Sequence, residues 1–158
     1  DYFLPNLRLF EKITTFGDMN VTFATHDIND IAAIAARAIV DPRTVNKAVQ
    51  IYANVVTQKE VVDMLRNCWP DHTFEYEHIS TEEITYQKDH ADPHLISAIG
   101  GAEPDRERWG INYTIWVLGR LSAPDHANTL NASELYPDYV YKKPQEVLCN
   151  RQFVFGDK

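Results

Sequence analysis

Residues 27–44 read DINDIAAIAARAIVDPRT and predict one complete helix together with both of its ends. The apolar residues of this stretch recur at the spacing of a single helical face: Ile28, Ile31, Ala32, Ala35, Ala38 and Ile39. Asp27 is of a type that caps helix N-termini, and Asp41-Pro42 ends the helix because the residue before a proline avoids helical geometry. An amphipathic helix is therefore expected here.

Short strands and further helices are predicted around this helix. Residues 21–24 and 48–53 are typical of strands, and residues 74–78 alternate aromatic or His with Glu, which predicts a half-exposed strand. Capping boxes at 57–60 and 80–83 each predict the start of a helix. The first of these helices carries Val61, Val62, Leu65, Cys68 and Trp69.

The later part of the chain is predicted to be helical. A short helical patch is expected at 95–99, a buried helix at 108–118, and a last helix from 143 to 151 with Pro144 at its first position. The element order predicts an α/β to α+β fold with few strands. A few short strands make a poor sheet alone, so we expect them to extend a larger parallel sheet supplied by residues before Asp1.

Composition favours one globular domain spanning 1–158. Apolar residues make up 44% of the 158 residues and charged residues 24%, and no apolar run approaches the roughly 20 residues of a membrane helix. The net charge of −8 argues against nucleic acid and anionic membranes as partners. Cys68 and Cys149 lack metal-type spacing and are interpreted as buried free thiols. The chain also contains three N-x-S/T glycosylation sequons, but such triplets are common by chance, so the balance favours a reducing, cytoplasmic compartment.

Three segments together carry a family likeness. They are YFLPNL at 2–7, the helix at 27–44, and NASELYPD at 131–138. In this order they resemble the C-terminal portion of the NmrA-like, isoflavone reductase-like family of atypical short-chain dehydrogenases. The resemblance implies the small substrate-binding domain of a Rossmann-type reductase, with helices around a few short strands.

The resemblance also implies what this chain does not hold. Full-length members bind NADPH on a Rossmann domain through an N-terminal glycine-rich loop, whereas the six glycines here are scattered. That domain and the family's catalytic lysine are expected to be absent, so no cofactor is expected to bind this chain alone. The family's Gly-Asp-Gly-Asn turn appears as Gly17-Asp18-Met19-Asn20, and because Met tolerates a positive φ poorly, a differently shaped loop is expected.

The resemblance places two segments at the substrate. Phe3, Pro5 and Asn6 become substrate-binding candidates, and Phe3 and Pro5 would also contact the nicotinamide cofactor where a Rossmann half is present. The wall of the pocket would come from one helix, with Trp69 as a further neighbour: Trp109, Tyr113, Trp116 and Val117. These rings suit an aromatic small molecule, and Tyr113 is the best catalytic candidate because its hydroxyl could orient or protonate a ligand. An aromatic core helix is the alternative.

Other polar groups are interpreted as structural. Residues 89–94 hold two histidines and two aspartates, but Pro93 disfavours the helix that would bring them together, so no metal site is expected. His26 and Asp27 could form an acid–base pair, although Asp27 already caps a helix. The acidic cluster of Glu75, Glu77, Glu82 and Glu83 is interpreted as a solvated face.

Three functions remain open from the sequence. The first is the substrate-binding half of an NADPH-dependent reductase of a phenylpropanoid-like or other secondary metabolite, whose partner is its missing N-terminal half or another chain. The second is a free-standing domain that catalyses a non-redox reaction, a cyclisation or isomerisation, on the same kind of ligand. The third is an NmrA-type regulatory or redox-sensing protein. A homo-oligomer is compatible with each.

Overall fold

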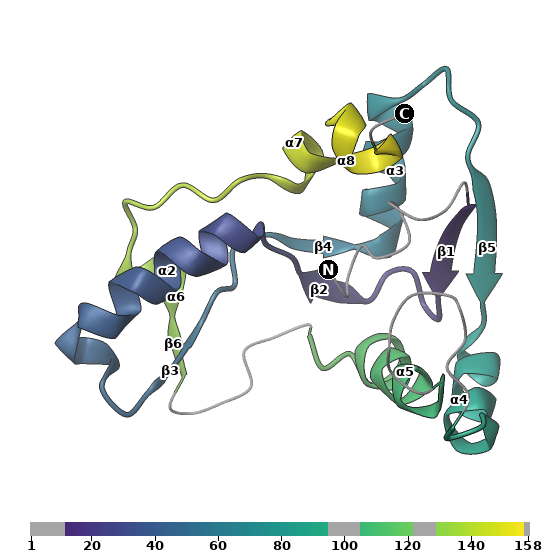
Figure 1. Cartoon of the computed structure of the whole chain (residues 1–158), viewed down its shortest axis with the longest axis horizontal. Helices are drawn as coiled ribbons and strands as arrows, with labels where there is room; N and C mark the ends of the chain where they lie inside the picture. The colour runs from purple at the N-terminus through teal and green to yellow at the C-terminus, as the bar shows by residue number, and fades with distance from the viewer. Residues whose placement is uncertain (1–11, 95–104, 122–128, 157–158) are drawn as a thin grey trace.

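Three two-stranded ladders organise the part of the chain that the computed structural model describes, residues 12–94, 105–121 and 129–156 (Figure 1). β1 (Lys12–Phe16) pairs in parallel with β5 (Glu75–Ile79), in a register that sets Lys12 opposite Glu75. β2 (Thr22–Ala24) pairs antiparallel with β4 (Val55–Thr57), and β3 (Ala48–Gln50) pairs in parallel with β6 (Thr129–Asn131). The expected mixture of helices with short, mostly parallel strands is confirmed.

The helices begin largely where the sequence signals predict. Asp27 caps α2 (Ile28–Val40) by accepting the backbone N–H of Asn29, and the 3-10 turn η1 (Pro42–Thr44) follows. Thr57 and Glu60 form the capping box of α3 (Gln58–Cys68), and Ser80 caps α4 (Thr81–His90). The remaining helices are α5 (Asp105–Asn112), the π-helical η2 (Tyr113–Val117), α6 (Ala132–Leu135), α7 (Pro144–Leu148) and α8 (Arg151–Phe155).

Two helix predictions are wrong in detail. The last helix is two helices, because the side chain of Asn150 accepts the N–H of Phe153 and starts α8 as a new element. The stretch at 108–118 is not buried throughout: α5 buries no residue, and η2 buries only Ile115 and Trp116. The short helix predicted at 95–99 lies outside the described residues.

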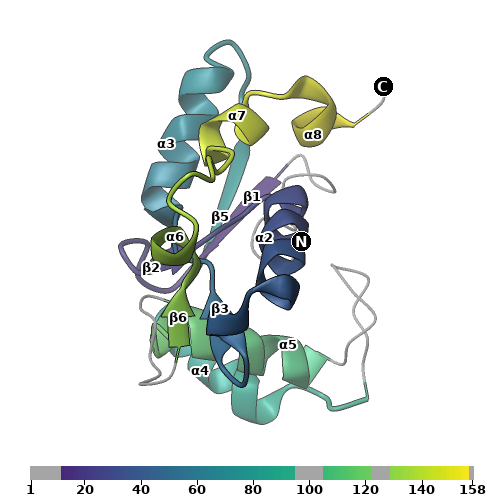
Figure 2. The same cartoon turned by 90° about the vertical axis from the view of Figure 1, so that its left-hand side faces the viewer.

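Buried side chains form two separate clusters. The larger one joins β1, β2, β4, α3, α4, η2, α7 and α8, with Leu65, Ile84 and Leu148 at 0% exposure. The smaller one joins α2 to α6 and the segment after it, and contains Ile34, Ala132, Tyr136 and Tyr141. Figures 1 and 2 show the matching separation, with α2, β3, β6 and α6 grouped apart from α3, α7 and α8.

The turn after β1 contains the Gly17-Asp18-Met19-Asn20 segment, for which a differently shaped loop was expected. Gly17 has φ +56°, and a Cβ there would lie 3.2 Å from the backbone oxygen of Trp116. Asn46 is the one non-glycine residue with positive φ in the described segments, so Met19 does not need that conformation. Asp18 shapes the rest of the turn by accepting hydrogen bonds from the backbone and side chain of Asn20.

α2 is oriented differently from what its apolar pattern suggests. Its buried residues are Asp30 and Ile34, whereas Ile28 is 73% exposed and Ile39 is 84% exposed. Asp30 accepts the hydroxyl of Tyr139 at 2.7 Å and the backbone N–H of Lys142 at 3.0 Å. The polar side of the helix therefore meets the smaller cluster, and much of its apolar side faces outward.

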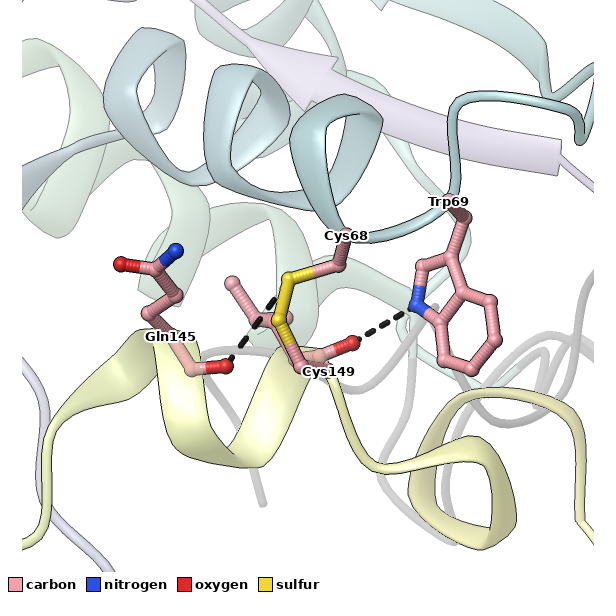
Figure 3. The surroundings of a disulfide bond; sticks show 5 residues. Cys68, Trp69, Gln145 and Cys149 are labelled. Atoms are coloured by element: carbon pink, nitrogen blue, oxygen red, sulfur yellow. Dashed lines mark hydrogen bonds between the residues drawn. A yellow bond between two sulfur atoms is a disulfide. The ribbon is translucent and has the colours of Figure 1, made fainter.

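The interpretation of both cysteines as free thiols is wrong. Cys68, the last residue of α3, forms a disulfide with Cys149 at the end of α7, with 5.0 Å between their Cα atoms (Figure 3). Both cysteines were predicted to be buried within helices, but Cys68 is half-buried at the end of α3 and Cys149 is exposed just after α7. Nothing in a separation of 81 residues indicates that the two helices pack together. The preference for a reducing, cytoplasmic compartment, which rested on free thiols, loses that support.

None of the described helices is both long enough and apolar enough to cross a membrane.

Candidate functional site

The aromatic helix predicted as a pocket wall is α5 continued by η2. Trp116 is 6% exposed and packs edge-to-face on Phe23, with 5.1 Å between the ring centroids. Trp109, Tyr113 and Val117 are half-buried and pack against the larger core cluster. Trp116 thus anchors the helix in the core, while the three half-buried residues keep part of their surface exposed.

Tyr113 begins the π-helical turn. The backbone N–H of Leu118 donates to the carbonyl oxygen of Tyr113 at 3.0 Å, five residues back. π-helical turns inside helices are frequently found at functional sites. The Nζ of Lys88, from α4, lies 4.9 Å from the centre of the Tyr113 ring, so a cation lies against the aromatic face. The ring of Tyr113 therefore lies beside a positive charge.

Trp69 has different neighbours. Its Nε1 donates to the carbonyl oxygen of Leu148 at 2.8 Å, beside the disulfide (Figure 3), and its ring packs edge-on against Phe155. These contacts bind it to α7 and α8, and Figures 1 and 2 both show α8 above and α5 below the β1–β5 ladder. The hydrogen bond and the ring contact of Trp69 are thus both with the C-terminal helices. Phe3, Pro5 and Asn6 lie outside the described residues.

The His and Asp residues at 89–94 make local contacts. Asp89 pairs with Lys88 at 2.6 Å, and Nδ1 of His90 lies 2.7 Å from the carbonyl oxygen of Tyr86. Lys88 holds the pKa of Asp89 below its usual value by hydrogen bonding. Within the described ranges, no group of three or more His, Cys, Asp or Glu side chains could hold a metal ion.

His26 and Asp27 make separate structural contacts. The Nε2 of His26 accepts the backbone N–H of Ala53 at 3.3 Å, while Asp27 caps α2 and pairs with Nζ of Lys142 at 3.1 Å. Hydrogen bonds from the backbone of Asn29 and from Lys142 lower the pKa of Asp27, so its carboxylate stays charged. His26 and Asp27 therefore bond to different partners, which supports the structural interpretation of both residues.

Because His26 is partly buried, we expect the free energy of unfolding to depend on pH. Burial lowers the pKa of His26 below its ordinary 6.5, and nearby Asp30 only partly opposes this. Because the unfolded chain then binds the proton more tightly than the folded chain, the stability is complete above about pH 6.5 and falls as the pH drops below it. Urea unfolding between pH 5 and 8 measures this. A His26→Gln variant should show a flatter profile; the same slope in both proteins would contradict the assignment.

A cavity of about 440 Å³ lies between α3 and the β1–β5 ladder. The sequence did not predict this cavity. Arg66 donates from Nε to the hydroxyl of Tyr76 at 3.1 Å, and Nδ1 of His78 lies 3.1 Å from Oγ1 of Thr15. The alternation of Tyr76 and His78 indicated that both share a strand face, but β1 opposite them was not predicted. The cavity is open and carries balanced charge from Lys59, Arg66, Asp63 and Glu77.

No family model matches the chain. The curated proteins that it resembles are nevertheless reductases or homologues of isoflavone reductase. The chain is 31% identical over 140 residues to pinoresinol reductase 1 of Arabidopsis thaliana, which covers 87% of this chain and 41% of the relative. It is 32% identical to the phenylcoumaran benzylic ether reductase Betv6 of Betula pendula, which covers 97% of this chain and 49% of the relative.

The chain also resembles solved structures of reductases of the same kind. A crystal structure of isoflavone reductase matches with a TM-score of 0.72 and 29% identity, over 93% of this chain and 48% of that one. A structure of AtPrR2 with NADP+ and (+)pinoresinol matches with a TM-score of 0.70 and 26% identity, over 97% and 48%. The chain is therefore similar to isoflavone reductase-like proteins over most of its length, and it spans about half the length of the relatives it matches.

Proposed function

We propose that this chain is the substrate-binding half of an NADPH-dependent reductase that acts on a phenylpropanoid-like aromatic metabolite. The observation that carries the proposal is the likeness to AtPrR2, whose structure contains NADP+ and (+)pinoresinol and which this chain matches over 48% of its length. About half of AtPrR2 lies outside the match and could bind the dinucleotide, while the half that this chain resembles could bind the substrate.

The described residues do not fit a dinucleotide by themselves. A Rossmann phosphate site needs a glycine-rich turn between a strand and a helix, where helix N–H groups meet the pyrophosphate. Gly17 lies between two strands, Gly110 lies inside α5, and Gly119 and Gly156 follow helical segments. In our proposal the cofactor, which supplies the hydride when bound, is held outside this chain, and this chain positions the substrate.

The substrate site proposed for this half lies against the half-buried face of α5 and η2, and Phe3, Pro5 and Asn6, which lie outside the described residues, remain candidates from the sequence. Trp109 and Val117 would give an apolar wall, and the Tyr113 hydroxyl would orient the ligand or donate a proton to it. The position of Trp116 supports this arrangement, because a buried anchor on Phe23 fixes the helix and with it the direction of Tyr113.

The first test of this division is cofactor binding. The chain alone is expected to show no saturable binding of NADPH, because the phosphate-binding loop that provides most of the anion site is missing from the described residues. Isothermal titration calorimetry with NADPH and NADP+ measures this. Saturable binding at micromolar ligand would place a dinucleotide site within this chain and contradict the proposal.

The second test concerns Tyr113. In the enzyme completed by its cofactor-binding half, Tyr113→Phe should lower turnover on the order of 100-fold if the hydroxyl donates a proton. The free energy of unfolding should change by no more than about 1 kcal/mol, because only one hydroxyl is removed. Steady-state kinetics and urea unfolding of the same preparation separate the two effects.

A matched control comes from the same helix. Trp116→Leu should lower stability through lost packing on Phe23, with turnover following only the folded fraction. Unchanged turnover in Tyr113→Phe would show that Tyr113 belongs to the core helix alone and has no role in the reaction.

A further inference from the structure

The disulfide between Cys68 and Cys149 lies near the protein surface. Cys149 is exposed just after α7, and Cys68 is half-buried at the end of α3 (Figure 3). A disulfide is opened when a thiolate attacks one of its two sulfur atoms, so the rate of opening depends on access to them. Exposed disulfides are accordingly the labile or regulatory ones. The Cys149 side of this bond is the accessible one.

The bond holds a short C-terminal segment in place. α7 and α8 have five residues each, and isolated helices of this length are not stable in water. We call residues 144–156, which contain both helices, the C-terminal strap. Leu148 at 0% exposure and Val154 at 4% attach the strap to the larger core cluster. The two helices therefore persist only while the strap is docked.

The noncovalent contacts of the strap gather around the disulfide. Trp69, which follows Cys68 directly, donates from Nε1 to the carbonyl oxygen of Leu148 at 2.8 Å, and Leu148 directly precedes Cys149. The Trp69 ring also packs edge-on against Phe155, with 5.0 Å between the ring centroids. The disulfide thus clamps together the same two surfaces that these contacts join, and its loss makes undocking of the strap easier.

The chain before the strap is held elsewhere. Tyr141 is buried in the smaller cluster, and Nδ2 of Asn54 donates to the carbonyl oxygen of Lys142 at 2.8 Å. When the strap leaves α3, the chain up to Lys142 therefore keeps its own attachments. Undocking of the strap is a local event that does not require the smaller cluster to unfold.

We propose that the Cys68–Cys149 bond is a site of reversible exchange with a dithiol reductant, and that its reduction releases the C-terminal strap from α3. A thiolate of the reductant attacks Sγ of Cys149 and forms a mixed disulfide, while Cys68 leaves as a thiolate and takes up a proton. The second thiol of the reductant then attacks its own sulfur in the mixed disulfide, and Cys149 leaves and is protonated. The reductant becomes a disulfide, and two electrons and two protons pass to the chain. This exchange does not depend on the proposed function.

The closeness of the two cysteines favours a dithiol over a monothiol. Their Cα atoms are 5.0 Å apart, so the Cys68 thiolate stays beside the mixed disulfide and can expel a monothiol again. A dithiol escapes this reversal, because its own second thiol resolves the mixed disulfide.

The rate of reduction is the first test, and it uses the intact native chain. Dithiothreitol is the dithiol, glutathione is the monothiol at equal thiol concentration, and alkylation followed by mass spectrometry counts the free thiols. Dithiothreitol should open the bond at least about tenfold faster than the chain unfolds under the same conditions, because no unfolding is needed for access. Glutathione should leave most of the bond intact. Reduction only as fast as unfolding, or equal reduction by both reagents, would overturn the proposed exchange.

Hydrogen exchange then tests the release of the strap. After reduction, the α7 and α8 amides should exchange on the order of 100-fold faster, because a covalent tether no longer opposes undocking. The α2 amides, which belong to the smaller cluster, should change by less than about threefold. A Cys68→Ser, Cys149→Ser double variant should exchange like the reduced chain with or without dithiothreitol. Unchanged exchange in the strap, or an equal increase in the strap and α2, would overturn a local release.

Discussion

Reducing the Cys68–Cys149 disulfide is expected to lower the free energy of unfolding by about 2 to 5 kcal/mol. The bond joins the end of α3 to the end of α7 across 81 residues, so it removes much conformational freedom from the unfolded chain. The helices it joins also meet in the larger core through Leu65 and Leu148, and its loss frees the C-terminal helices from one of their attachments.

Urea unfolding of the oxidised and reduced protein measures the effect. A Cys68→Ser, Cys149→Ser double variant should unfold at the midpoint of the reduced protein, and reductant should not change it further. Titration of the native protein with a thiol reagent gives an independent check, with no reactive thiol expected before reduction. Equal midpoints with and without reductant would show that the bond contributes nothing to stability.

Leu65→Ala is expected to destabilise the protein by about 2 to 5 kcal/mol. Leu65 is 0% exposed at the centre of α3 and belongs to the cluster that joins β1, β2, β4 and the C-terminal helices. Truncation removes buried apolar surface and leaves a cavity that helices anchored at both ends cannot readily close.

Ile39→Ala is the matched control for Leu65→Ala. It truncates another aliphatic side chain within a helix, but Ile39 is 84% exposed, so the chain alone should lose no more than about 0.5 kcal/mol. Urea unfolding of both variants at one protein concentration provides the comparison. Similar losses in the two variants would contradict the assigned orientation of α2.

Local signals in the sequence predicted where helices begin and end, but not which face of a helix is buried. Asp27, Pro42 and the Thr57–Glu60 box act within a few residues, so they can be recognised without knowing what lies nearby. The apolar spacing of α2 predicted the helix, but spacing does not say which face meets the chain's own core. Buried Asp30 decides that, through partners more than a hundred residues away in sequence.

Strands and long-range bonds were harder to predict. β6 has three residues, too few for an alternating pattern to stand out, and the disulfide depends on how α3 packs on α7. The candidate site shows the same division: Trp109 and Tyr113 were placed on one helix by their spacing, while the contacts of Trp69 with the C-terminal helices depend on tertiary packing.

The pairing of β1 with β5 and of β3 with β6 has a consequence for the order in which the chain is made. Phe16 leaves the ribosome long before its partner Ile79, and Val49 long before Leu130. Both parallel ladders must therefore wait with unpaired edges until distant residues are synthesised, and the larger core closes only once Leu148 and Val154 arrive. A nascent chain in this state is exposed to aggregation, so chaperones that shield apolar segments should matter more for its yield than its modest size suggests.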